Sequence, residues 1–201
     1  MTRRCSSLRA PTQSPREDII ALGLILAVLN GAIANVALPA IAHDLRTDPS
    51  TSIWVVNAFQ LAVTVSLLPL SSLGEIHGYR RVYRWGLVIF TAASILCALS
   101  STFPVLIAAR VAQGIGAAGI MSVNSALVRF VFPRAQLGRG MAAMGLIVAI
   151  SSASGPTIAA TILSFASWHW LFLANVPFGL FAVWLARRAL PATPRSANTP
   201  R

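Results

Sequence analysis

The stretch "AARVAQGIGAAG", from Ala108 to Gly119, places one arginine inside a run of apolar and small residues. A guanidinium at the centre of a bilayer costs about 2.5 to 3.5 kcal/mol on insertion scales, so it normally faces a protein interior or a watery cavity. On a helix, Gln113 and Gly114 lie on the same face as Arg110, one turn further along. The stretch therefore predicts a membrane helix whose polar face lies inside a bundle.

The composition of the whole chain is also typical of a membrane protein. Hydrophobic residues make up 56% of the 201 residues and charged residues only 10%, whereas a soluble domain has about 25% charged residues. The basic residues are all arginines, and with five acidic residues they give a net charge of +11. On a soluble chain this charge would indicate nucleic acid as the partner. Here the arginines flank apolar segments, which indicates a lipid bilayer instead.

Six segments are long and apolar enough to cross a bilayer, which takes about 20 residues in helical form. The loops between them are rich in turn formers and too short to hold a soluble domain. We therefore predict an all-α integral membrane fold, with an N-terminal tail (1–18), a six-helix transmembrane bundle (19–190) and a C-terminal tail (191–201). The expected spans lie near 19–41, 52–72, 84–101, 104–127, 141–165 and 170–188.

The distribution of the arginines predicts how the chain is oriented. Fourteen of the 16 lie in the two tails and in the second and fourth loops, whereas the opposite side has only Arg46 and the membrane holds Arg110. Cytoplasmic loops carry an excess of Lys and Arg. We predict a multi-pass protein of the cell (inner) membrane with both termini in the cytoplasm. The Arg-rich start imitates a secretory signal peptide, but the apolar run that follows it is too long for one.

No carboxylate of an expected span can pair with Arg110, because all five acidic residues fall in a tail or a loop. Arg110 then has to be answered by amides, hydroxyls, carbonyls or water, by a transient anion, or by a carboxylate of another chain. Amides between membrane helices often serve stability alone. The candidate substrate or ion pathway comprises Arg110, Gln113, Asn30, Asn35, Asn57 and Gln60, with Asn124 as a further amide.

The fifth span contains "SSASGPTIAA" (151–160), in which a helix hinge is expected at Gly155 and Pro156. A proline inside a helix frees a backbone carbonyl and bends the helix. The polar residues present assemble no nucleophile with a base, no metal cluster and no cofactor motif. We therefore expect no enzyme, and neither a cofactor nor a metal site.

Five motifs occur in an order that resembles the major facilitator superfamily, most closely its fourteen-helix drug:proton antiporters of the EmrB/QacA type. The resemblance covers residues 19–190, the N-terminal six-helix half. It implies two six-helix bundles that enclose a central site and rock in alternating access, with amphipathic drugs, antibiotics and dyes as typical substrates. The motifs are "LNGAIANVALP" (29–39), "LPLSSLGEIHGYRR" (68–81), "LIAARVAQGIGAAG" (106–119), "SGPTIAA" (154–160) and "WHWLFLANVPFG" (168–179).

The same resemblance implies roles for individual residues. Between the second and third expected spans, Glu75 stands where the family has Asp, and Gly78, Arg80 and Arg81 follow it in what would be a gating loop. The alternative interpretation is that the charges of this loop only set the orientation of the chain in the membrane. The family implicates the arginine at position 110 in proton coupling. However, the first span reads Asn30 where this branch commonly has Asp, so this half lacks the usual residue for proton exchange.

Three functions are compatible with these features. The chain stops at Arg201, where the family would continue through a linker into further helices, so the leading expectation is the N-terminal half of an efflux permease for drugs or antibiotics. A second possibility is a half-transporter that works as a homodimer or with a separate C-terminal half. The third is a non-transporting membrane binding or scaffold protein. The expected partners are the lipid bilayer and a small amphipathic substrate, not nucleic acid.

Overall fold

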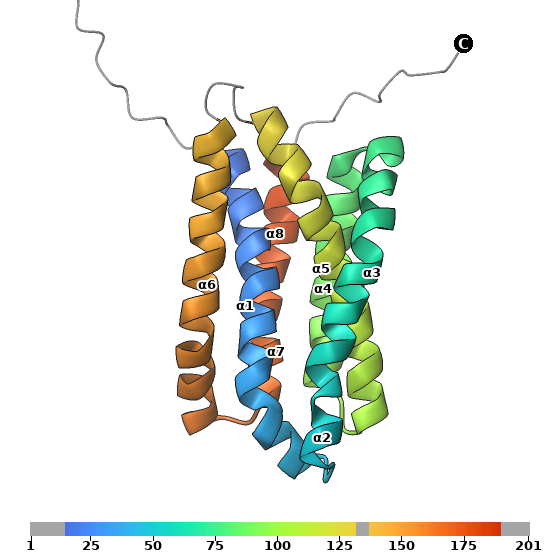
Figure 1. Ribbon diagram of the computed structural model, residues 1–201, viewed down its shortest axis with the longest axis vertical. Coiled ribbons are helices and arrows are strands. Elements are labelled where there is room, and N and C mark those ends of the chain that lie inside the picture. The colour runs from blue at the N-terminus through green and yellow to red at the C-terminus, as the bar shows by residue number, and fades with distance from the viewer. Residues whose placement is uncertain (1–14, 132–136, 190–201) are drawn as a thin grey trace, which may run out of the picture.

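The computed structural model describes the backbone over residues 15–131 and 137–189, and the side chains over 21–122, 138 and 141–188. All secondary structure within these ranges is helical, and six segments are long and apolar enough to cross a membrane. The predicted all-α integral membrane fold is thereby confirmed. Figure 1 shows the long helices standing side by side in one bundle.

Eight helices make up the six spans, because the second and sixth spans each begin with a short helix. The first helix begins at Pro15, within the predicted N-terminal tail, and its candidate membrane span begins at Ala21. Residues 1–14 and 190–201, which include most of the predicted N-terminal tail and all of the predicted C-terminal tail, lie outside the described ranges. The helices are α1 (Pro15–Asp44), α2 (Pro49–Ser52), α3 (Trp54–His77), α4 (Tyr79–Ala98), α5 (Phe103–Val131), α6 (Leu137–Phe165), α7 (His169–Leu173) and α8 (Asn175–Ala189).

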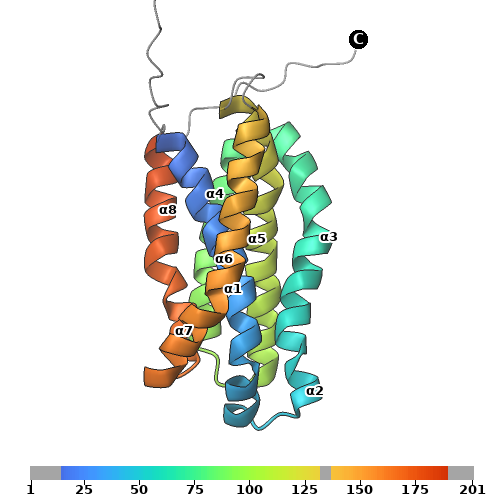
Figure 2. The same ribbon diagram turned by 60° about the vertical axis from the view of Figure 1, so that its left-hand side comes forward.

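Helix α5 packs between two other long helices on one side of the bundle. Helix α5 lies against both α3 and α4, α1 lies against α6, and α8 lies against α4 and α1 (Figures 1 and 2). Small residues allow the closest approaches: a Cβ on Gly116 of α5 would lie 2.5 Å from the backbone nitrogen of Phe90 on α4. Between membrane helices such close backbone contact is a principal source of packing energy.

The interior contains two apolar clusters, one toward each end of the bundle. Leu24 and Phe90 belong to one cluster, and Ile41 and Trp168 belong to the other. Along α1, Asn30 lies between the two clusters and is itself buried. The interior of the bundle is therefore apolar toward both ends and polar at the level between the two clusters.

The connection between α3 and α4 differs from the predicted loop. Only Gly78 separates the two helices, with φ 91° and ψ 129°. Glu75 lies in the last turn of α3, and Arg80 and Arg81 lie in the first turn of α4. The prediction of a loop here was wrong because charged side chains near a membrane surface can reach water while their backbone stays helical.

Helix α6 is continuous through Pro156, which is exposed. The neighbouring Gly155 is buried, and a Cβ on it would lie 2.5 Å from the Cβ of Ala32 on α1. Gly155 thus serves close packing between α1 and α6. A hinge at this position stays a prediction.

Candidate functional site: a buried polar network

Arg110 lies on α5 and is completely buried, with 0% of its surface exposed. Its Nε donates a hydrogen bond of 2.9 Å to the backbone carbonyl of Val55 on α3, and its Nη1 donates one of 2.6 Å to Oε1 of Gln113. The guanidinium carbon also lies 4.3 Å from the ring centroid of Phe59 and 5.6 Å from that of Phe172. A carbonyl, an amide and two aromatic faces therefore answer the charge.

Gln113 connects Arg110 to the other buried polar groups. Its Nε2 donates to Oγ of Ser94 on α4 at 2.8 Å and to Oδ1 of Asn30 on α1 at 3.3 Å. The same oxygen of Asn30 accepts a hydrogen bond of 3.1 Å from Nδ2 of Asn175 on α8. Together with Val55 on α3, the network links five helices.

The sequence of α5 explains why its side chains reach so many neighbours. Arg110 and Gln113 lie one turn apart and so share a face of the helix. Glycines bring the adjacent helices into contact: a Cβ on Gly114 would lie 2.6 Å from the carbonyl oxygen of Phe59 on α3, and Gly116 meets α4 as described above. Because the backbones are so close, short hydrogen bonds can form across both helix interfaces.

Two donors of the network have no hydrogen-bond partner among the described residues. These are Nη2 of Arg110 and Nδ2 of Asn30, and both atoms are buried. A buried polar group without a partner carries a desolvation penalty. The long helices contain two acidic residues whose side chains are described, Asp44 and Glu75. They lie in the last turns of α1 and α3, away from the network. The network therefore has spare donors but no carboxylate that could exchange a proton.

The predicted pathway residues separate into two groups. Arg110, Gln113 and Asn30 come together in the network. The hydrogen bonds of Arg110 all go to groups of the same chain. Asn35, Asn57 and Gln60 are exposed and lie outside the network. Asn35 donates only to the carbonyl of Gly31 in its own helix, at 3.3 Å. The side chain of Asn124 is outside the described ranges.

The sequence analysis missed four network members: Ser94, Asn175, the carbonyl of Val55, and Cys97, whose Sγ donates to Oε1 of Gln113 at 3.8 Å. Asn175 had a detectable signal, because it is a polar residue within the motif "WHWLFLANVPFG". Ser94 had none, since serines are scattered over every span. A backbone carbonyl carries no sequence signal at all.

The comparison with known families fits this architecture. Residues 20–201 match the Major Facilitator Superfamily. The chain belongs to this superfamily. Its members are transporters and not enzymes, so the expectation that the chain is no enzyme is confirmed. The chain is thus a multi-pass membrane protein.

Several curated superfamily members are similar to the chain. The uncharacterized transporter YebQ of Escherichia coli (strain K12) is 57% identical over 182 residues, which cover 90% of this chain and 40% of YebQ. The riboflavin transporter RibZ of Clostridioides difficile (strain 630) is 37% identical over 86% of this chain and 38% of RibZ. The putative multidrug resistance protein MdtD of Salmonella paratyphi B is 37% identical over 81% of this chain and 34% of MdtD. The chain thus spans less than half the length of these relatives.

Proposed function

We propose that this chain forms the N-terminal six-helix half of an efflux permease for amphipathic organic molecules, of the fourteen-helix EmrB/QacA type. The observation that carries the proposal is a pair of amides, Asn57 and Gln60, which are exposed within the apolar membrane span Pro49–His77. An amide that faces hydrocarbon loses its hydrogen bonds to water without replacing them. This side of α3 therefore faces a water-filled cavity or a second bundle.

The polar side of α3 is distinct from its apolar side. Asn57, Gln60 and Thr64 lie three or four residues apart, so they share one side of the helix. The hydroxyl of Thr64 donates a hydrogen bond of 2.9 Å to the backbone carbonyl of Gln60, so it does not engage the side-chain amide of Gln60. Val65 is 71% exposed and lies about 140° around the helix from Gln60. The apolar side suits lipid, and the polar side suits a substrate pathway.

The buried network supports this proposal through rigidity. In alternating access the two bundles move largely as rigid bodies around a site between them. A network that ties five helices together through fully buried side chains keeps this half rigid during that motion. Because the network has no carboxylate, we assign ion coupling, where it occurs, to residues outside it.

The similarity to MdtD favours drug efflux, and the similarity to RibZ makes riboflavin a second candidate substrate. We further propose that the end of the bundle bearing Arg80, Arg81 and Arg187 faces the cytoplasm, in line with the positive-inside rule. The second six-helix bundle then follows in the same polypeptide, is a separate C-terminal half, or is a second copy of this chain. A binding or scaffold protein that does not transport is the competing function.

Complementation tests these functions directly. The chain is expressed in bacteria that lack their own exporters, alone or with the part of YebQ that follows the matched segment, and accumulation of a cationic dye and of riboflavin is measured. We expect lower dye accumulation only when both halves are present. A decrease with the chain alone would indicate a homodimer. Unchanged accumulation in every case, with both halves confirmed in the membrane, would contradict transport of these compounds.

Cysteine labelling tests the assignment of the polar side of α3. In a Cys5→Ser background, where the fully buried Cys97 is protected, Asn57→Cys and Gln60→Cys are compared with Val65→Cys in intact membranes. We expect a water-soluble maleimide to label the first two variants and to leave Val65→Cys unlabelled. The reverse pattern would show that the amides face lipid.

A further inference from the structure

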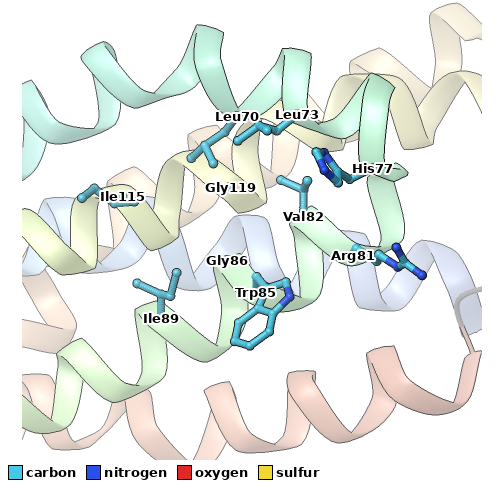
Figure 3. A pocket seen from close by; sticks show the side chains of 10 residues that line it. All are labelled: Leu70, Leu73, His77, Arg81, Val82, Trp85, Gly86, Ile89, Ile115 and Gly119. Atoms are coloured by element: carbon cyan, nitrogen blue, oxygen red, sulfur yellow. The ribbon is translucent and has the colours of Figure 1, made fainter.

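A groove opens on the outside of the bundle between α3, α4 and α5, near the end where Gly78 joins α3 to α4. Its volume is about 390 Å³. Figure 3 shows His77 and Arg81 at one end of the groove, and Ile89 and Ile115 at the other. The groove is thus polar at the end of the helices and apolar toward the middle of the bundle. Its lining comprises Leu70, Leu73, His77, Arg81, Val82, Trp85, Gly86, Ile89, Ile115 and Gly119.

Two glycines form the floor of this groove, which explains why it is open. Helices α4 and α5 touch there through their backbones, since a Cβ on Gly119 would lie 3.1 Å from Cα of Gly86. The larger side chains of Leu73, Ile89 and Ile115 are each more than a third exposed. They stand around the floor and leave a narrow apolar channel parallel to α4.

A second hollow of about 450 Å³ adjoins the groove and shares Arg81 and Trp85 with it. Arg84 and Arg187 also line this hollow, and none of its lining residues is acidic. Arg80 donates 3.0 Å to the backbone carbonyl of Arg187, which fixes the start of α4 against α8. The polar end of the groove is therefore a rigid, strongly positive surface.

We propose that this groove binds one anionic phospholipid, with its phosphate at Arg81 and Arg84 and one acyl chain along the apolar channel. Trp85 is 67% exposed at this level, and exposed tryptophans are enriched where the membrane meets water. From Arg81 to Ile89 the channel runs about 12 Å along α4 into the hydrocarbon depth. Clustered arginines at that surface attract anionic headgroups.

The geometry favours a lipid over a transported substrate as the occupant. Leu73 lies about 140° around α3 from Gln60, so the groove and the polar side of α3 face different directions. Within the groove, the polar side chains are confined to its outer end. An occupant with one anionic head and one apolar chain matches that division. The inference does not depend on which substrate the protein transports.

Lipid titration of the purified, delipidated full chain tests the headgroup contact. Binding of phosphatidylglycerol is compared with that of phosphatidylcholine with identical acyl chains, by native mass spectrometry. We expect tighter binding of phosphatidylglycerol, and about 25-fold weaker binding after Arg81→Gln with Arg84→Gln, at about fivefold for each arginine. The matched control is Arg188→Gln, which removes a charge at the same end from a residue that stacks on Trp184 and lines neither hollow. The control keeps wild-type affinity.

Two further arms distinguish a lipid from a free anion. Glycerol phosphate and inorganic phosphate, which lack an acyl chain, are expected not to displace the lipid at matched concentrations. Leu73→Trp fills the channel and is expected to abolish preferential binding, whereas Leu68→Trp, on an exposed position of the same helix outside the groove, leaves it intact. Equal binding of the two lipids, equal effects of the Arg81/Arg84 and Arg188 variants, or displacement by phosphate alone would each overturn the proposal. Because Leu73→Trp leaves the arginines intact, it remains informative even where the double variant does not fold.

Discussion

Arg110 on α5 and Val55 on α3 are joined by a hydrogen bond of 2.9 Å from the guanidinium Nε to a backbone carbonyl. The charge inside this bundle is therefore answered by backbone and amide oxygens. The carbonyl of a helix is fixed in place, so the contact sets the position of α5 relative to α3. Substitutions of Arg110 are therefore expected to affect the stability of the bundle first.

Arg110→Lys is expected to lower the free energy of unfolding by about 3 kcal/mol, because a lysine cannot donate to both Val55 and Gln113 and keeps a buried charge. Arg110→Met removes the charge together with its desolvation penalty and should destabilise less. Thermal unfolding of both variants in the same detergent measures the difference. A methionine variant less stable than the lysine variant would contradict this account.

Asn30→Leu is expected to cost about 1 to 3 kcal/mol, because it removes the oxygen that accepts from both Gln113 and Asn175 and leaves each of these amide nitrogens with a single acceptor, Ser94 Oγ and the carbonyl of Leu171 respectively. Asn30→Asp keeps that acceptor and removes the unpartnered Nδ2, so it should be tolerated. Chemical denaturation in detergent, compared with wild type, checks both. If leucine proved harmless, the hydrogen bonds of 3.3 and 3.1 Å would contribute no stability.

Gly116→Ala should strongly reduce the yield of folded protein, because its Cβ would lie 2.5 Å from backbone atoms of Phe90 that cannot move aside. Gly145 on α6 offers a matched control, since a Cβ there meets nothing within 4 Å. Gly145→Ala is expected to be neutral or stabilising by up to about 1 kcal/mol, from helix propensity alone. Size-exclusion profiles of the two variants after identical expression provide the comparison.

Gly78→Ala is expected to destabilise the turn between α3 and α4 by about 1 to 3 kcal/mol, because φ 91° is a backbone conformation that favours glycine. Gly138→Ala serves as the control, as its added Cβ meets nothing within 4 Å. Thermal unfolding separates the two variants. Equal midpoints would show that the chain reaches another turn geometry without strain.

Asp44→Ala should loosen the end of the bundle opposite to Gly78. There, Nε1 of Trp168 donates 2.8 Å to Oδ2 of Asp44, and Trp168 is almost fully buried at 2% exposure. A hydrogen bond to a charged group contributes about 1.5 to 3 kcal/mol. Asp44→Asn keeps a neutral acceptor and should lose less. Tryptophan fluorescence during denaturation records both variants.

The sequence predicted the membrane helices because hydrophobic length is a local property that each segment carries by itself. It also predicted that Arg110 and Gln113 share a helix face, since a spacing of three residues fixes that relation. The ends of the helices were harder to predict from the sequence. Around Gly78 the charged residues indicated a loop, yet snorkelling side chains allow the helix to continue to His77.

Only the tertiary structure decided which amides accompany Arg110. Asn30 and Asn57 look alike in sequence, as single amides in apolar spans, but one is buried in the network and the other is exposed. The difference arises from the rotation of each helix about its axis, which close packing at residues such as Gly114 and Gly116 sets. The sequence by itself determined the helices, their apolar character and the presence of an unmatched charge. Packing between helices determined what answers that charge, because the partners come from segments far apart in the chain.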